Sequence, residues 1–342
     1  MTAPSGRTPA YSVVVPTLAR PCLADCLAAL AAAGSPEPAE VIVVVDLPGG
    51  AVSPQADAEA LREAAGGLAE RLRLVPGGGR GPAAARNAGA RAAHGEWVVF
   101  LDDDVRVTAG WAGRLAADLA GAGPGTGGVQ GRLRVPLPVG RRPTDWERGT
   151  AGLEDAAWAT ADMAYRTAAL RAVGGFDERF PRAFREDADL ALRMLDAGWE
   201  LTRGRRETLH PVRPADPWVS VRVQRGNADD ALMTRLHGAD WWERAGAPRG
   251  RLPRHAVVAL AAAAAPVALA LGRRRAAAGW AALWALGTAE FAWARIAPGP
   301  RTADEVAAMV LTSCAIPPLA VAHWLSGRVR HRAAGPWTGG AA

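Results

Sequence analysis

Short apolar runs alternate with polar, helix-type segments through the first half of the chain. Val and aromatic residues predict strands over Tyr11–Val15, Val41–Val45, Leu72–Val75, Trp97–Leu101 and Val129–Val135. Continuous apolar runs of this length are typical of strands that are buried on both faces. Their alternation with helices predicts an α/β fold with a doubly wound, mostly parallel sheet.

The pattern changes after Arg254, where three long apolar segments follow one another. They are Ala256–Leu271, Ala276–Ala294 and Val306–Leu325. The third has no charged residue and is long enough to cross a hydrocarbon layer of about 30 Å. We expect C-terminal hydrophobic helices that associate with a membrane through two or three spans. The first segment is short and rich in Ala, so an interfacial or buried helix is the alternative for it.

These changes divide the chain into five parts. They are a tail at 1–10, an α/β domain at 11–225, a linker or interfacial segment at 226–255, membrane-associated helices at 256–330 and a tail at 331–342. The first ten residues lack the apolar core of a signal peptide, so we expect the α/β domain to remain in the cytoplasm.

Charge is distributed unevenly along the chain. Residues 1–247 contain 29 Arg and 31 acids, a net charge of −2, whereas residues 248–342 contain 11 Arg and 3 acids, a net charge of +8. A basic, apolar C-terminal region favours a membrane surface as its partner, and the net-negative first part argues against nucleic acid. By the positive-inside rule, Arg273–Arg275 should lie inside and the connection from Arg295 to Glu305 outside.

The fourth predicted strand ends in three consecutive carboxylates, Asp102-Asp103-Asp104. Open α/β sheets bind ligands at the carboxyl ends of their strands. Adjacent carboxylates repel one another unless a cation compensates them, and Mg²⁺ or Mn²⁺ prefers oxygen ligands. An acidic turn that caps the next helix is the alternative explanation for the motif taken alone.

Further motifs occur in a fixed order around this one. Val13-Val14-Val15-Pro16-Thr17 and Asp46 come first, and Ala85-Arg86-Asn87-Ala88-Gly89 precedes the three carboxylates. Gly174-Gly175-Phe176-Asp177 and Glu186-Asp187 follow them. Over roughly residues 11–215 this order resembles the inverting family-2 glycosyltransferases of GT-A fold. The resemblance implies that the α/β domain is catalytic and uses a nucleotide-sugar donor.

The resemblance also implies where the donor binds. Pro16, Thr17 and Asp46 would lie near the base and ribose, and Arg86 or Asn87 near the nucleotide. Asp102 and Asp103 are also candidate donor-binding residues. A turn cap is the alternative role for Asp46, and a surface helix charge for Arg86. The sequence Asp46-Leu47-Pro48-Gly49 differs from the acidic-Gly-Ser run of many relatives, which leaves the identity of the nucleotide open.

Asp102 and Asp104 match the outer positions of the family's Asp-x-Asp motif, which implies a Mg²⁺ or Mn²⁺ ion beside the donor diphosphate. Asp104 is the expected direct ligand, whereas Asp102 either contacts the ribose or binds the ion through water. His210 follows at a place where some GT-A enzymes supply a further ligand, although a lone His is more often structural. A bound ion would stabilise charge on the leaving nucleoside diphosphate.

Glu186-Asp187 opens a predicted helix and matches the family's Glu-Asp pair. Inversion requires one base on the acceptor hydroxyl, on the face opposite the leaving group. Asp187 is the candidate base, and Glu186 the supporting residue or acceptor contact. Helix capping is the alternative role for both carboxylates.

These expectations favour a membrane-associated, metal-dependent, inverting glycosyltransferase. Its acceptor would be a cell-envelope molecule, a lipid-linked molecule or a polysaccharide. A nucleotidyltransferase is the alternative enzyme, but it usually has a Gly-rich phosphate loop where this chain has Pro16-Thr17-Leu18-Ala19-Arg20. A catalytically inactive glycosyltransferase-like binding module is the non-enzymatic alternative.

Overall fold

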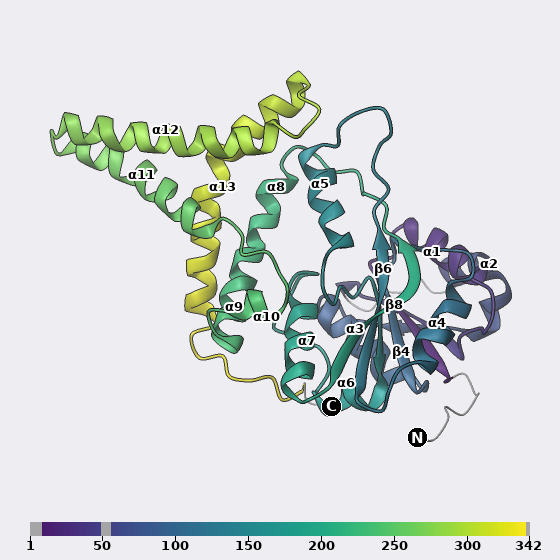
Figure 1. Ribbon diagram of the computed structural model, residues 1–342. Helices are drawn as coiled ribbons and strands as arrows, with labels where there is room; N and C mark the ends of the chain where they lie inside the picture. The colour runs from purple at the N-terminus through teal and green to yellow at the C-terminus, as the bar shows by residue number, and fades with distance from the viewer. Residues whose placement is uncertain (1–8, 49–55, 340–342) are drawn as a thin grey trace. The chain divides into compact units, whose positions relative to one another are not determined.

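The computed structural model describes residues 9–48 and 56–339, so most of the predicted N-terminal tail lies outside the described residues. The chain forms two compact units (Figure 1). We call the first the sheet unit; it comprises Met1–Pro136, Leu153–Pro211 and Pro336–Ala342. The second, the helical unit, comprises Leu137–Gly152 and Val212–Gly335. The helical unit therefore includes an excursion from within the α/β part of the sequence, whereas the prediction drew one boundary at residue 225.

The sheet unit contains an eight-stranded sheet in the order β3-β2-β1-β4-β7-β6-β8-β5. The strands are β1 (Tyr11–Thr17), β2 (Glu40–Val45), β3 (Leu72–Pro76), β4 (Trp97–Leu101), β5 (Arg106–Val107), β6 (Thr126–Arg134), β7 (Asp162–Arg166) and β8 (Glu200–Leu209). Strands β3, β2, β1 and β4 run parallel. This confirms the predicted α/β class and all five predicted strands.

The second half of the sheet is mixed. Strand β7 runs antiparallel to both β4 and β6, whereas β6 and β8 run parallel. The apolar pattern did not identify β5, β7 or β8. Strand β8 has the sequence ELTRGRRETL, whose charged side chains conceal a strand that is fixed by its pairing with β6.

Helices cover both faces of the sheet. They are α1 (Cys22–Ala31), α2 (Ala56–Ala65), η2 (Gly66–Arg71), α3 (Pro82–Ala92), α4 (Trp111–Ala120), α6 (Thr167–Ala172) and α7 (Glu186–Asp196). Leu27 and Trp111 belong to the core on one face, and Phe100 and Leu190 to the core on the other. Because β1, β2 and β4 are buried on both faces, their side chains are apolar at nearly every position.

The helical unit consists of helices and short connections. It contains α5 (Asp145–Ala151), α8 (Val219–Arg222), η4 (Val223–Gly226), α9 (Asn227–His237), α10 (Trp241–Arg244), α11 (Leu252–Ala270), α12 (Arg274–Ile296) and α13 (Ala303–Arg330). Another short helix, η3 (Gly152–Glu154), begins at the boundary between the units. The three predicted apolar segments correspond to α11, α12 and α13. Two of these helices, α11 and α13, have the length and hydropathy to cross a membrane.

Candidate active site

The carboxyl ends of the parallel strands bring the predicted motifs to one edge of the sheet. Thr17 pairs in register with Val45, so the loops that follow β1 and β2 begin side by side. Strand β4 lies on the other side of β1, and the three carboxylates follow its last residue, Leu101. Residues far apart in sequence therefore approach one another where the edges of open α/β sheets bind ligands.

Asp102, Asp104 and His210 form a cluster that can hold a metal ion. One ligand atom from each residue lies within 4.8 Å of the others. His210 comes directly after β8, which pairs with β5, and β5 follows the three carboxylates. The tertiary pairing of two strands that the sequence did not predict therefore brings His210 to Asp104.

The surroundings of this cluster fit a hard divalent cation. Two carboxylates and one imidazole are suitable ligands for Mn²⁺ or Mg²⁺. Nδ1 of His210 is buried and has no hydrogen-bond partner among the residues that the structure describes. Burial, followed by the charge of Asp102, raises the pKa of Asp104. A cation here would compensate this negative charge.

Asp103, the central carboxylate, has a different environment. Its side chain is fully buried, accepts a hydrogen bond of 2.6 Å from Thr17 Oγ1 and forms an ion pair with Arg20. Asp103 thus joins the β1 loop to the β4 loop, while Asp102 and Asp104 belong to the candidate metal-binding cluster. Arg20 was not among the predicted site residues, although its place four residues after Pro16 was visible in the sequence.

Asp46 accepts two backbone hydrogen bonds from the Gly-rich loop before α3. The donors are the amides of Arg80 at 3.0 Å and Gly81 at 2.8 Å. A Cβ at Gly77 would come within 2.7 Å of Asp46 Oδ1, so glycine permits this approach. Asp46 therefore holds this loop at the end of β2. Pro16 lies in β1 beside this edge and is half-buried.

Arg86 connects the two groups of acidic residues. Its guanidinium donates 2.9 Å to Asp102 Oδ1 and 2.7 Å to Glu186 Oε1. Only 3% of its side chain is exposed, so it is a buried ion-pair residue and not the surface helix charge of the alternative interpretation. Arg86 lies on α3, which the first-turn residue Pro82 begins.

Asn87 organises the turn that contains Gly174-Gly175-Phe176-Asp177. Its Nδ2 donates 2.8 Å to the carbonyl of Phe176, and its Oδ1 accepts 2.8 Å from the amide of the same residue. A Cβ at Gly175 would come within 2.5 Å of Asn87 Oδ1, and Gly175 also has a positive φ of 69°. Both polar groups of Asn87 are thus used in positioning the chain that leads to α7.

Glu186 and Asp187 form the first residues of α7. Glu186 is buried, and burial raises its pKa to about 8, opposed by the charge of Arg86. Asp187 is partly exposed, and its Oδ1 accepts 2.7 Å from the amide of Ala188. Burial also raises the pKa of Asp187, and the nearby negative charge of Asp102 acts in the same direction. Of the pair, Asp187 is therefore the more exposed carboxylate.

Comparison with known proteins finds similarity to glycosyltransferases in the N-terminal part of the chain. Residues 12–147 match the model of the family described as Glycosyl transferase family 2. We call this matched region, residues 12–147, the family-2 domain. The chain is also 33% identical over 136 residues to the pre-mycofactocin glycosyltransferases of Mycobacterium tuberculosis strains CDC 1551/Oshkosh and ATCC 25618/H37Rv. That match covers 36% of this chain and 28% of each relative.

A solved structure extends the fold comparison beyond this domain. The mannosyltransferase PcManGT from Pyrobaculum calidifontis, in complex with GDP-Man and Mn²⁺, gives a TM-score of 0.50 at 20% identity. The alignment covers 97% of this chain and 89% of that protein. The fold of the family-2 domain is therefore GT-A, as the resemblance implied.

Proposed function

We propose that this protein is a metal-dependent, inverting glycosyltransferase that transfers a sugar from a nucleotide-sugar donor. The observation that carries the proposal is the bridge made by Arg86. It joins Asp102, part of a cluster suited to a divalent ion, to Glu186 at the start of α7. Donor activation and acceptor deprotonation need two carboxylate groups with different tasks in one site.

In this proposal Asp104 and His210 hold Mn²⁺ or Mg²⁺ together with Asp102. When bound, the ion supplies charge compensation for the leaving nucleoside diphosphate. PcManGT, which shares the fold, was solved with GDP-Man and Mn²⁺. The same classes of donor and ion suit the acidic cluster of this chain.

The base and ribose of the donor would contact Pro16, Thr17 and Asp46. The buried hydrogen bond from Thr17 to Asp103 supports this role, because it fixes the β1 loop relative to the metal-binding carboxylates. Asp46 acts by holding the loop at Gly81 as well as by facing the donor. Asn87 is a positioning residue in this scheme, since its amide is bonded to Phe176.

Asp187 would accept the proton of the acceptor hydroxyl as the sugar is transferred. A base for an inverting reaction must reach the acceptor, and Asp187 is more exposed than Glu186. Glu186, bonded to Arg86, would support the base through the local charge. The attacking oxygen forms the new glycosidic bond, while the bond from the sugar to the diphosphate oxygen breaks.

We further propose that the acceptor is a cell-envelope, lipid-linked or polysaccharide molecule and that the family-2 domain faces the cytoplasm. The exposed apolar side chains of α11, α12 and α13 support membrane association, because large apolar patches on a protein surface usually contact a partner or lipid. Nucleotide sugars in the cytoplasm would then reach the site, and a lipid-linked acceptor would be available in the same membrane.

The test is release of UDP or GDP from a panel of nucleotide sugars by the purified full-length protein. We expect release from at least one donor with Mn²⁺ or Mg²⁺, loss of release with EDTA and recovery when the ion is restored. The Asp187→Asn variant serves as the control for contaminating hydrolases. Equal release by this variant and the wild type, or full turnover in EDTA, would contradict the proposal.

A further inference from the structure

Helices α11 and α12 of the helical unit form a hairpin (Figure 1), and exposed apolar side chains lie along both of them. Exposed apolar side chains also occur on α13, for example Leu311 and Val329. Every residue from Ala256 to Leu271 is apolar, and no residue from Ala276 to Ala289 is charged. The exposed side chains are therefore apolar all round this part of the hairpin. They include Val257, Leu260, Val267, Leu269, Leu271, Leu283, Trp284 and Leu286. A helix that lies on a membrane surface needs a polar face, whereas a helix that is apolar on all sides is surrounded by protein or hydrocarbon.

The two helices pack on each other through small residues. A Cβ at Gly287 would come within 2.5 Å of Val258, and Ala261, Ala268 and Ala277 are buried. Close packing through Gly and Ala is typical of helix pairs in membranes. Charged and aromatic residues lie at the base of the hairpin, where Arg251 and Arg254 pair with Glu290 and Trp293 is exposed. Such residues are typical of the boundary between lipid and water.

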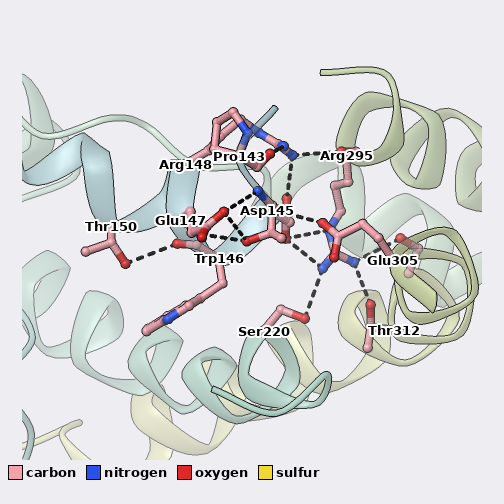
Figure 2. Close-up of polar contacts among 12 residues, drawn as sticks. Pro143, Asp145, Trp146, Glu147, Arg148, Thr150, Ser220, Arg295, Glu305 and Thr312 are labelled. Atoms are coloured by element: carbon pink, nitrogen blue, oxygen red, sulfur yellow. Dashed lines mark hydrogen bonds and ion pairs between the residues drawn. The ribbon is translucent and has the colours of Figure 1, made fainter. Parts of the chain in front are cut away.

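The connection after α12 is tied to α5. Arg148 donates 2.7 Å to the carbonyl of Arg295, and Glu305 accepts 2.8 Å from the amide of Asp145 (Figure 2). The Arg295 guanidinium in turn donates 2.8 Å to Asp145 and 2.9 Å to Ser220. Because both helix ends contact α5, the segment between them must lie on the same side of a membrane as α5.

Helix α5 itself must stay on the side of the family-2 domain. It belongs to the excursion Leu137–Gly152, whose two ends continue directly into the sheet unit. Five charged residues occur in this excursion: Arg141, Arg142, Asp145, Glu147 and Arg148. A segment of this length and charge cannot cross a bilayer. The contacts between α5 and the α12–α13 connection therefore argue against the outer loop that the positive-inside rule predicted for this connection.

The chain after α13 returns to the same side. The indole of Trp337 donates 2.8 Å to the carbonyl of Gly174, and both residues belong to the sheet unit. Within the helical unit, α13 packs so closely on α9 that a Cβ at Gly327 would come within 2.6 Å of the Ala228 carbonyl. Helix α9 is short and carries Asp229, Asp230 and Arg235. A single helix with both ends on one side cannot span a membrane, and this argues against α13 as a transmembrane helix despite its length and hydropathy.

We propose that the α11–α12 hairpin enters the lipid bilayer from the side of the family-2 domain and that α13 remains on that side. This inference rests on the membrane association in the proposed function and specifies which helices contact the hydrocarbon. The apolar parts of the two helices, 16 and 14 residues long, measure about 24 and 21 Å at about 1.5 Å per residue. They reach through most of a hydrocarbon core of about 30 Å. Arg273, Arg274 and Arg275 at the turn of the hairpin would then lie near the far headgroups, and not inside as the positive-inside rule predicted.

Thiol labelling tests the sidedness. The background variant is Cys22→Ala with Cys314→Ser, and it retains Cys26 because that thiol is buried. Single cysteines are introduced at Pro298, in the α12–α13 connection, and at Ala28, an exposed residue of α1, as the matched control. We expect a membrane-impermeant maleimide to label Pro298→Cys and Ala28→Cys from the same side in intact cells and inverted vesicles. Labelling from opposite sides would overturn the inference.

Flotation with vesicles of phosphatidylcholine and phosphatidylglycerol tests which helix is inserted. Leu286 on α12 and Leu311 on α13 are 71% and 58% exposed, so Leu286→Asp and Leu311→Asp form a matched pair. A charge deep in the bilayer should lower vesicle binding roughly 100-fold for Leu286→Asp, and less than about fivefold for Leu311→Asp. Equal losses, or a larger loss for Leu311→Asp, would overturn the hairpin assignment.

The same experiments separate this inference from the proposed enzymatic function. A wild-type protein that does not float would contradict both membrane association and the hairpin inference. If the wild type floats and the hairpin variants behave as expected, absence of donor turnover would count against the proposed enzyme alone.

Discussion

Each compact unit contains a buried arginine, but the two arginines have different hydrogen-bond and ion-pair partners. In the sheet unit, Arg86 is shared by Asp102 and Glu186. In the helical unit, Arg295 is 7% exposed and bonds to one carboxylate, Asp145, and to the hydroxyls of Ser220, Thr312 and Ser313 (Figure 2). Arg86 thus pairs with two carboxylates, whereas Arg295 pairs with one carboxylate and donates its other hydrogen bonds to hydroxyl groups.

The difference distinguishes a candidate catalytic site from a structural junction. At Arg86 two carboxylates share one positive charge, whereas at Arg295 one carboxylate pairs with one positive charge. Burial raises the pKa of Asp104, Glu186 and Asp187, so negative charge near Arg86 is costly in the absence of a cation. Perturbed carboxylates gathered at a sheet edge are typical of functional sites. Arg295 instead joins α5, α8 and α13 to the end of α12, which is a structural task.

The largest expected effect concerns the metal. Asp104→Asn removes a ligand and should lower turnover by about 10³-fold, because stabilisation of the leaving diphosphate is lost. Mn²⁺ should raise the Tm of the wild type but not that of Asp104→Asn. The matched variant in the helical unit, Asp145→Asn, should keep the Mn²⁺ response. A normal response in Asp104→Asn would place the ion elsewhere.

The next effect concerns the proposed base. Asp187→Asn preserves the shape and the helix start but removes the basic oxygen, so we expect turnover to fall roughly 10²-fold or more. Affinity for UDP or GDP with Mn²⁺, measured by calorimetry, should change little, because Asp187 is not part of the metal-binding cluster. If the variant transfers sugar at a near wild-type rate, Asp187 only caps α7 and Glu186 becomes the candidate base.

Replacing each buried arginine tests the comparison directly. Arg86→Ala and Arg295→Ala should each lower the free energy of unfolding by about 3 kcal/mol, since each leaves a carboxylate without its buried partner. Only Arg86→Ala should also weaken Mn²⁺-dependent binding of UDP or GDP, by about tenfold. Thermal melts and calorimetry measure the two quantities. A comparable loss of nucleotide binding in Arg295→Ala would mean that the helical unit takes part in the site.

The smallest effect concerns pH. The pKa of Glu186 rises from 4.5 to about 8 on folding, so its contribution to stability is complete below about pH 4.5 and is lost as pH rises through about 8. Between pH 5.5 and 7.5 the free energy of unfolding should fall by about 2 kcal/mol through this group, since each pH unit contributes about 1.4 kcal/mol. Glu186→Gln should flatten that slope in urea denaturation. An unchanged slope would mean that Arg86 keeps Glu186 ionised.

Local pattern was sufficient for the strands that are buried on both faces and for the long apolar helices of the C-terminal part. The strand Trp97–Leu101 was predicted with its observed bounds, and the apolar segments after Arg254 became α11, α12 and α13. Continuous apolar runs of this kind can be recognised from the sequence without tertiary information. The order of the motifs also indicated the GT-A fold, through its resemblance to the family-2 glycosyltransferases.

Only the tertiary structure determined which polar side chains contact one another across elements that are far apart in the sequence. The sequence made Asp102, Asp103 and Asp104 look equivalent, but successive residues of a chain point in different directions, and Asp103 turns inward to Thr17 and Arg20. In the same way, hydropathy alone made α13 a candidate span. The tertiary structure adds contacts of α13 with α5 and α9, and these contacts are the basis of the proposal that α13 stays outside the bilayer.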